Sequence, residues 1–440
     1  MTFFERISEA AANAAHHSGS SRASHGNRVS VRRTARRRTI GAASLIVGMV
    51  AAAGAATTFG VAAPTGPGTG PWQGDDGVIR QGEQIFASWS AYFLGPDGIS
   101  RRTCGHMTRP GAVTAESALD SPADCTFTFT NPAADYDPSL GVFRVPVVVH
   151  VIRNSSGTQG NVPMSRVLSQ IEILNEDFRA LPGTPGAGGT DVGIEFFLAT
   201  EDPSGNPTDG VTYSNNTQWY NDGGAYWNTL AWDTNRYLNI YTNTAGGDLG
   251  YVPDLPQGGI AGQNSDRVVV LWEAFGRNAP IGAPFNQGRT ATHEVGHYFG
   301  LEHTFFNGCG SLAACNSTGD LICDTNRQSF PTTGCGGSSC GSLNPFDNFM
   351  DYSDDTCMER FTPEQARRMR CSLVHYRPQL SEIETECAAD VDGSGAVDFG
   401  DIVSVLSAFG PCPGCTADVD ASGSVDFTDL VTVLSAWGPC

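Results

Sequence analysis

The sequence predicts a mixed α/β main domain followed by a small module made of two repeats. Three observations support this fold class. Runs of β-branched residues with the length of strands recur in the middle of the chain, starting at residues 144–152. One amphipathic helix follows the first run, because apolar residues recur at helical spacing from Met164 to Phe178. After residue 385 the composition changes to two short, near-identical acidic segments. Strands that alternate with a helix are typical of an α/β layer fold.

The other elements follow in order along the main domain, which we place at residues 141–384. Further strands are expected at 193–199, 237–241 and 267–271. The pattern becomes helical again near residue 289, and a long loop rich in Gly, Ser and Cys follows at 308–342. A last helix begins with Thr362 as its N-cap and Pro363 at its first helical position.

The charge and the first residues of the chain indicate a secreted protein. The 440 residues carry 26 basic and 46 acidic side chains, and the formal net charge of −20 argues against nucleic-acid binding. An arginine-rich start is followed by an apolar run at 40–56 that ends in small residues, which is typical of an export signal. We assign residues 1–63 to this signal, and paired arginines allow a twin-arginine route. The alternative is an uncleaved membrane anchor.

Residues 64–140 are rich in Gly, Pro, Ala and Asp and show no sustained periodicity. They are expected to form a loop-rich pro-segment or linker. The thirteen cysteines of the chain fit an oxidising compartment. We therefore expect a secreted or cell-surface protein that has no stable membrane span once the signal is removed.

The segment His-Glu-Val-Gly-His-Tyr-Phe-Gly-Leu-Glu-His carries the main motif. On a helix, His293 and His297 lie on one face, so both can bind one metal ion. Gly300 permits the left-handed turn that ends the helix, and the returning chain brings His303 as a third ligand. Three protein ligands leave one position open for water, as in catalytic zinc sites. Glu294 can then act as the general base that takes a proton from that water during peptide hydrolysis.

This motif and its flanking segments resemble the metzincin peptidases, and within them the pappalysin family. The resemblance runs over most of residues 144–369, and residues 348–358 resemble the methionine turn of the family. It implies a zincin-like fold with a twisted mixed sheet, an active-site helix, and Met350 beneath the metal. It also implies that Tyr352 lies near the metal and assists the transition state, and that Asp355 lies in a substrate pocket that attracts arginine. The alternatives are an ordinary core methionine for Met350 and a solvated surface aspartate for Asp355.

The resemblance extends to part of the cysteine-rich loop. Four cysteines match disulfides of the family, namely Cys309, Cys335, Cys340 and Cys357. Cys315 with Cys323 would form an additional local bridge. Residues 319–325 resemble a calcium-binding loop of the family.

Cys104-Gly105 in the pro-segment resembles the Cys-Gly pair of some zymogens of this family. In that role the thiolate fills the fourth zinc position and displaces the catalytic water. The odd number of cysteines leaves room for such a thiol. The alternative is a bridge between Cys104 and Cys125 that closes a short loop. If Cys104 is a switch, removal of the pro-segment by a cut between Cys104 and Arg144 would activate the enzyme.

The C-terminal repeats, residues 385–440, carry the spacing of EF-hand calcium loops, with oxygen ligands at positions 1, 3, 5, 9 and 12. The ligands are Asp390, Asp392, Ser394, Asp398 and Asp401 in the first repeat and Asp418, Asp420, Ser422, Asp426 and Asp429 in the second. Each loop leads into a short helix, at 402–409 or 430–437, and no helix precedes it. The module therefore resembles dockerin repeats and is expected to bind two calcium ions. The resemblance implies a cohesin-like or cell-surface partner.

Each repeat also begins with a cysteine and closes with Gly-Pro-Cys. This pattern predicts two bridges within the repeats, Cys387–Cys412 and Cys415–Cys440.

Together these features predict a secreted zinc-dependent metalloendopeptidase that acts on protein or peptide substrates. The alternative is a catalytically silent surface or scaffold protein that docks through its C-terminal calcium repeats. Glu294 favours the enzyme, because a silent relative would be expected to lose that base first.

Overall fold

The computed structural model describes residues 71–95, 98–105, 124–131, 136–384, 389–394, 396–412, 414–420 and 422–439. The predicted export signal at 1–63 lies outside these residues. Within the described ranges, no helix combines the length and the apolar character that crossing a bilayer requires.

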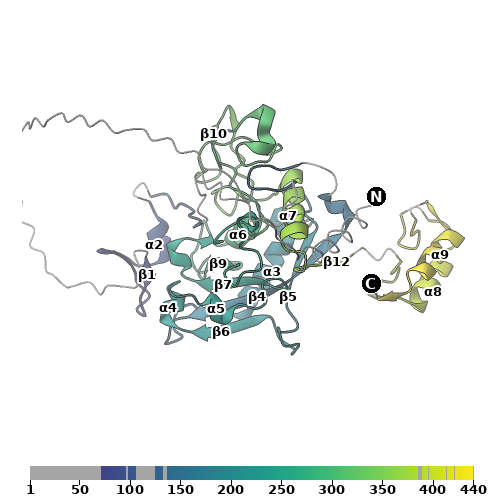
Figure 1. Ribbon diagram of the computed structural model, residues 1–440, viewed down its shortest axis with the longest axis horizontal. Coiled ribbons are helices and arrows are strands. Elements are labelled where there is room, and N and C mark those ends of the chain that lie inside the picture. The colour runs from purple at the N-terminus through teal and green to yellow at the C-terminus, as the bar shows by residue number, and fades with distance from the viewer. Residues whose placement is uncertain are drawn as a thin grey trace, which may run out of the picture. The chain divides into compact units, whose positions relative to one another are not determined.

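A seven-stranded mixed sheet forms the base of the main domain (Figure 1). Its longest strand, β4 (Val142–Arg153), pairs in parallel with β7 (Leu238–Asn243). β7 in turn pairs in parallel with β9 (Val268–Leu271). All three strands were predicted, with ends that differ by one or two residues.

The remaining strands complete the sheet around this centre. β5 (Ile194–Leu198), which was predicted, and β6 (Val211–Asn215), which was not, pair in parallel with the first and second halves of β4. β8 (Gly250–Tyr251) and β12 (Glu382–Glu384) are antiparallel and stand at the two ends of the strand order. β6 could not be predicted because its residues are mostly polar and only partly buried. Its sequence therefore shows no clear alternation of apolar and polar residues.

Alternate residues of β4 point to opposite faces of the sheet and so build two cores. Val145, Val147, Val149 and Val151 belong to the larger core, whereas Ile152 belongs to the core on the other face. The larger core is closed by α3 (Met164–Phe178) and α6 (Arg289–Tyr298), which contact each other and the sheet. Both helices lie where the sequence predicts them.

The segment before the main domain, which is expected to be loop-rich, also contains short strands and a helix. β1 (Trp72–Gln73), β2 (Ile79–Gln81) and β3 (Gln84–Phe86) form a small antiparallel sheet, and α2 (Trp89–Phe93) follows. Ile79, Trp89 and Phe93 are buried in the second core of the main domain. Strands of two or three residues are too short to show a period in the sequence, so they could not be predicted.

α7 (Pro363–Tyr376) begins at the predicted cap. The Thr362 hydroxyl accepts a hydrogen bond from the backbone N–H of Gln365 at 3.2 Å, and the Gln365 side chain accepts one from the N–H of Thr362 at 2.9 Å. This reciprocal pair is a capping box. The loop before α7 is closed by the disulfides Cys309–Cys340, Cys335–Cys357 and Cys315–Cys323, and the last of these confirms the predicted local bridge.

The C-terminal module consists of two short helices, α8 (Phe399–Ser407) and α9 (Phe427–Ser435). They begin three residues before the predicted starts. The reason is that Asp398 and Asp426 cap them from within the acidic loops, each by accepting a backbone N–H two residues later.

The two repeats of this module pair crosswise through short strands. These are β13 (Ala396–Val397) with β16 (Gly438–Pro439), and β14 (Gly410–Pro411) with β15 (Ser424–Val425). The pairing of β14 with β15 directs the end of the first repeat toward the second. Cys412 therefore forms a disulfide with Cys415, and the predicted Cys387–Cys412 and Cys415–Cys440 bridges are wrong. Cys387 and Cys440 lie outside the described residues.

Candidate metal centre

Three histidines converge at the end of α6. His297 Nε2 lies 3.2 Å from His293 Nε2 and 3.0 Å from His303 Nε2, and all three side chains are buried. Zn–N bonds of about 2.0–2.1 Å in a tetrahedral site would separate the ligand nitrogens by roughly 3.3 Å. The observed separations are close to that value.

Backbone carbonyls set the orientation of two of these rings. His293 Nδ1 lies 2.7 Å from the carbonyl oxygen of Phe349, and His297 Nδ1 lies 2.7 Å from that of Leu301. A carbonyl can only accept a hydrogen bond, so Nδ1 of each ring carries the proton and the Nε2 lone pair points to the centre. Lone pairs that face each other repel unless a cation lies between them. The donor set therefore fits a zinc ion.

Two glycines let the chain fold this tightly. Gly300 has φ of 91°, and a Cβ there would lie 2.5 Å from Ser372 Oγ. This left-handed residue ends the helix, as predicted, and returns the chain so that His303 reaches the centre. A Cβ on Gly296, between the first two histidines, would collide with Met350 Sδ. The fully buried Met350 thus packs against the metal-binding helix, and the need for glycine at 296 was missed in the sequence.

The metal-binding helix is fixed to α3 by a buried ion pair that the sequence did not reveal. Arg289 Nη2 lies 3.2 Å from Asp177 Oδ1, and the Thr292 hydroxyl donates to Asp177 Oδ2 at 2.6 Å. A partner lost from such a pair leaves an uncompensated buried charge, so the pair fixes the helix position.

Glu294 and Cys104 complete the cluster. The Cys104 sulfur and one nitrogen of each histidine all lie within 4.8 Å of one another. The Cys104 thiol also donates to Glu294 Oε2 at 3.3 Å. Glu294 is buried, and this burial raises the pKa of its carboxyl to about 8. Cys104 is not bridged to Cys125, which forms a disulfide with Cys371 instead, so that alternative is wrong.

Asp355 is buried, and its partner is an arginine of the same chain. The Arg102 guanidinium pairs with Asp355 Oδ1, and both side chains are almost fully buried. Arg102 also donates to Thr290 Oγ1 at 3.1 Å, while the N–H of Gln287 donates to Asp355 Oδ2 at 2.8 Å. The alternative of a solvated surface aspartate is wrong. The role of Arg102 was missed, although an opposite charge two residues before Cys104 was a usable signal.

Tyr352 stands beside the centre, as the methionine-turn pattern implied. Its hydroxyl donates to the carbonyl of Cys104 at 3.4 Å, and its ring lies 4.9 Å from the His303 ring. Burial raises the pKa of this phenol above its ordinary value, so its proton is available for donation.

The acidic loops of the C-terminal module also gather ligand atoms. Carboxylate oxygens of Asp390, Asp392 and Asp401 lie within 4.8 Å of one another, and those of Asp418, Asp420 and Asp429 repeat the arrangement. The other four predicted ligands serve locally: Ser394 and Ser422 donate to carbonyls in their own loops, and Asp398 and Asp426 cap helices.

The loop at 319–325 contains a further buried carboxylate. Asp320 accepts from the Thr325 hydroxyl at 2.6 Å and from the N–H of Ile322 at 3.2 Å. These contacts stay within the loop and identify no ligand.

Comparisons with known proteins identify the family of the chain. The family described as pregnancy-associated plasma protein-A matches residues 209–374. An extracellular metalloprotease of Colletotrichum graminicola is 35% identical over 252 residues, covering 54% of this chain and 79% of the relative. One of Pyricularia oryzae is 34% identical over 245 residues, covering 53% and 76%. A solved structure of Tannerella forsythia mature mirolysin in complex with a cleaved peptide is 34% identical, covers 55% of this chain and 98% of that chain, and has a TM-score of 0.45. The chain therefore belongs to the extracellular metalloprotease family and is a zinc metalloendopeptidase.

Proposed function

We propose that this chain is secreted as a latent zinc metalloendopeptidase in which Glu294 is the general base and Cys104 maintains latency. One observation carries the proposal. Three histidine nitrogens and the Cys104 sulfur lie within 4.8 Å of one another, and the Cys104 thiol donates to Glu294 Oε2 at 3.3 Å. The names of the extracellular relatives support secretion.

The catalytic roles follow from this geometry. His293, His297 and His303 would hold the zinc ion, which when bound supplies an acidified water and a positive charge for the reacting carbonyl oxygen. Glu294 accepts the proton of the water and returns it to the leaving amine. The Tyr352 hydroxyl, which contacts a carbonyl of the pro-segment in the latent form, can donate to the substrate oxygen in the same place.

Latency follows from the path of the pro-segment. Thr103 accepts a hydrogen bond from the N–H of Leu249 at 3.0 Å, and Gly105 donates one to the carbonyl of Gly250 at 3.0 Å. The pro-segment thus pairs in parallel with β8 at one bridge, Cys104 with Gly250, and places the Cys104 sulfur at the histidines. A thiolate there would be the fourth zinc ligand and would exclude the reacting water. The same strand edge is closed to a substrate until the segment leaves.

The pocket at Asp355 supports a preference for arginine next to the cut bond. Arg102 shows that an arginine side chain can be buried in this pocket with its charge paired. Removal of the pro-segment would leave the Asp355 carboxylate without that charge. A substrate guanidinium restores the pair, and an apolar side chain does not.

The C-terminal repeats are proposed to bind two calcium ions, one in each acidic loop. The support is the twofold repetition of three carboxylates in the same arrangement. Val403 and Leu406 on α8, and Val431 and Leu434 on α9, are about half exposed at equivalent positions. These apolar side chains are suited to a cohesin-like or cell-surface partner. A catalytically silent scaffold protein would need only the C-terminal module. The presence of all the residues of the proposed catalytic cluster argues against this scaffold role.

The test is hydrolysis of gelatin by the processed, secreted protein. We expect activity that is lost in Glu294→Ala and on zinc chelation, with zinc content unchanged in Glu294→Ala. Cys104→Ser should make the unprocessed chain active. Lack of hydrolysis by protein that is shown to be folded, zinc-loaded and processed past Cys104 would overturn the catalytic proposal and favour the scaffold role.

A further inference from the structure

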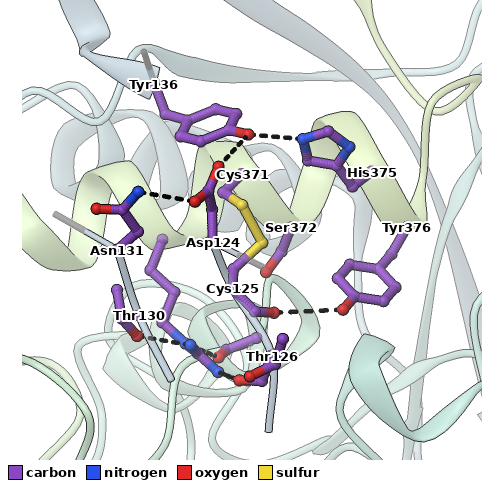
Figure 2. The surroundings of a disulfide bond; sticks show 12 residues. Asp124, Cys125, Thr126, Thr130, Asn131, Tyr136, Cys371, Ser372, His375 and Tyr376 are labelled. Carbon is purple, nitrogen blue, oxygen red and sulfur yellow. Dashed lines mark hydrogen bonds between the residues drawn. A yellow bond between two sulfur atoms is a disulfide. The ribbon is translucent and has the colours of Figure 1, made fainter. Parts of the chain in front are cut away.

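A short segment between Cys104 and the main domain is covalently bound to α7. Residues 124–131, which we call the Cys125 segment, carry the disulfide from Cys125 to Cys371 across a sequence separation of 246 residues. Figure 2 shows this disulfide and the polar residues around it. Both cysteines are buried. The sequence placed this segment in the removable pro-segment.

A buried arginine of α7 depends on the Cys125 segment for its hydrogen bonds. Arg368 is 1% exposed. Its guanidinium donates to Thr130 Oγ1 at 2.6 Å and to the carbonyls of Thr126 and Phe129 at 2.9 and 3.3 Å. Its remaining bond goes to the carbonyl of Gly300 at 2.7 Å, in the turn that delivers His303. Without the segment, a buried cation would lose three of these four bonds, which proteins avoid.

Other contacts fix the same segment from several sides. The carbonyl of Cys125 accepts from the Gln257 side chain at 3.1 Å and from the Tyr376 hydroxyl at 3.3 Å. Asp124 accepts from the Tyr136 hydroxyl, which lies 2.7 Å from His375 Nε2 (Figure 2). The Cys125 segment is therefore packed against α7, next to the turn at Gly300 that precedes His303.

We infer that the Cys125 segment remains in the active enzyme and that the activating cut precedes Cys125. This inference rests on the proposed latency through Cys104. Activation requires hydrolysis of one peptide bond between Gly105 and Asp124, by water in the site of an endopeptidase. A cut after Asn131 would leave Cys104 attached to the enzyme through the Cys125–Cys371 disulfide. A tethered inhibitor has an effective concentration on the order of millimolar, so it would rebind and the enzyme would stay latent.

Two variants of the full chain test this inference. Each carries one recognition sequence of a site-specific protease, either between Gly105 and Asp124 or between Asn131 and Tyr136. After the same digestion, we expect the first to release its pro-segment and to gain at least 100-fold in peptide hydrolysis. The second should show a nick only after reduction of its disulfides, and its activity should remain at the latent level.

Removing the Cys125–Cys371 disulfide should allow the nicked second variant to become active. With Cys125→Ser and Cys371→Ser added, the nicked pro-segment is no longer tethered and should dissociate on dilution, with a rise in activity. The matched control adds Cys315→Ser and Cys323→Ser, which removes a local bridge and should leave the nicked protein latent. Circular dichroism checks that each variant is folded.

Full activity of the nicked second variant with its disulfide intact would overturn the inference. So would a natural mature N-terminus that follows Cys125. Both outcomes differ from a failure of the proposed function, in which neither cut gives activity. The tether itself is measured by mass under non-reducing conditions, so its presence is decided without any enzymatic assay.

Discussion

The pairing of Arg102 with Asp355 predicts that the pro-segment inhibits the enzyme through two contacts. One is Cys104 at the metal site, and the other is Arg102 at Asp355. Replacing Arg102 by alanine would leave Asp355 buried without its partner. Loss of one member of a buried ion pair costs about 3–5 kcal/mol. Water can enter the vacated pocket, and the N–H of Gln287 still donates to Asp355, so we take the lower end of that range. Three kcal/mol corresponds to roughly 100-fold in an inhibition constant.

The assay uses a synthetic peptide of residues 98–105 as an inhibitor of the activated enzyme. The inhibition constant of the natural peptide is compared with that of the Arg102→Ala peptide. Arg101→Ala is the matched control, because it removes the same charge from a neighbouring residue that makes no contact with Asp355 among the hydrogen bonds and ion pairs described for it. Cys104→Ser measures the contribution of the thiol separately.

We expect Arg102→Ala to weaken inhibition by about 100-fold and Arg101→Ala by less than about threefold. Arg102→Lys should fall between them, because an ammonium keeps the charge and loses the planar arrangement of donors. A threefold or smaller effect of Arg102→Ala would refute the reasoning. It would mean that the attraction between Arg102 and Asp355 contributes no more free energy of binding than the desolvation of the two charges costs.

Three further predictions concern the repeats, the core and the site. Chelation of calcium in the Glu294→Ala protein should lower the melting temperature of the C-terminal module, with Asp401→Ala removing about half of the calcium dependence, as followed by calorimetry. Burial lowers the pKa of His150 from 6.5 to about 4, so its folded form resists protonation and stability falls as the pH drops below 6.5. Between pH 7.5 and pH 5 this amounts to about 2 kcal/mol, which urea unfolding should show as a difference in pH dependence between the wild type and His150→Gln. Tyr352→Phe should lower kcat by roughly 100-fold, with KM and zinc content unchanged.

The fold could be predicted where local pattern and tertiary structure agree. β4 could be predicted from its run of β-branched residues and α3 from its apolar residues at helical spacing. α6 could be predicted from the spacing of its histidines, and Thr362 marks the start of α7 by its cap. The pro-segment sheet and β6 could not be found, because their strands are short or half buried and gain stability only from the surfaces they cover. Periodicity in a sequence shows which side of a helix or strand is buried, but it does not show which other element packs against that side.

The convergence of the three histidines could be predicted because these residues are close in sequence. His293, Glu294 and His297 fall on one helix, and Gly300 marks the turn to His303. Contacts between distant residues were not predictable, and they include Arg102 with Asp355 and Cys125 with Cys371. A cysteine or an arginine in a sequence shows what it can bind, and only the fold shows what lies within reach.

The order of residues in the pro-segment has a consequence for the direction of the substrate. Arg102 pairs with Asp355, and Cys104, two residues later, lies at the histidines, so the pro-segment runs from the proposed pocket to the proposed metal site. A substrate that ran the same way would place arginine before the cut bond. A substrate that runs from metal to pocket places arginine after it. The pro-segment presents the Cys104 sulfur to the histidines, and a chain that binds against the productive direction would not be cut. We therefore expect the activated enzyme to cut on the amino side of arginine. The measurement is a map of the cut sites in a peptide library. Products that end in arginine would contradict the inference that substrate and pro-segment bind in opposite directions.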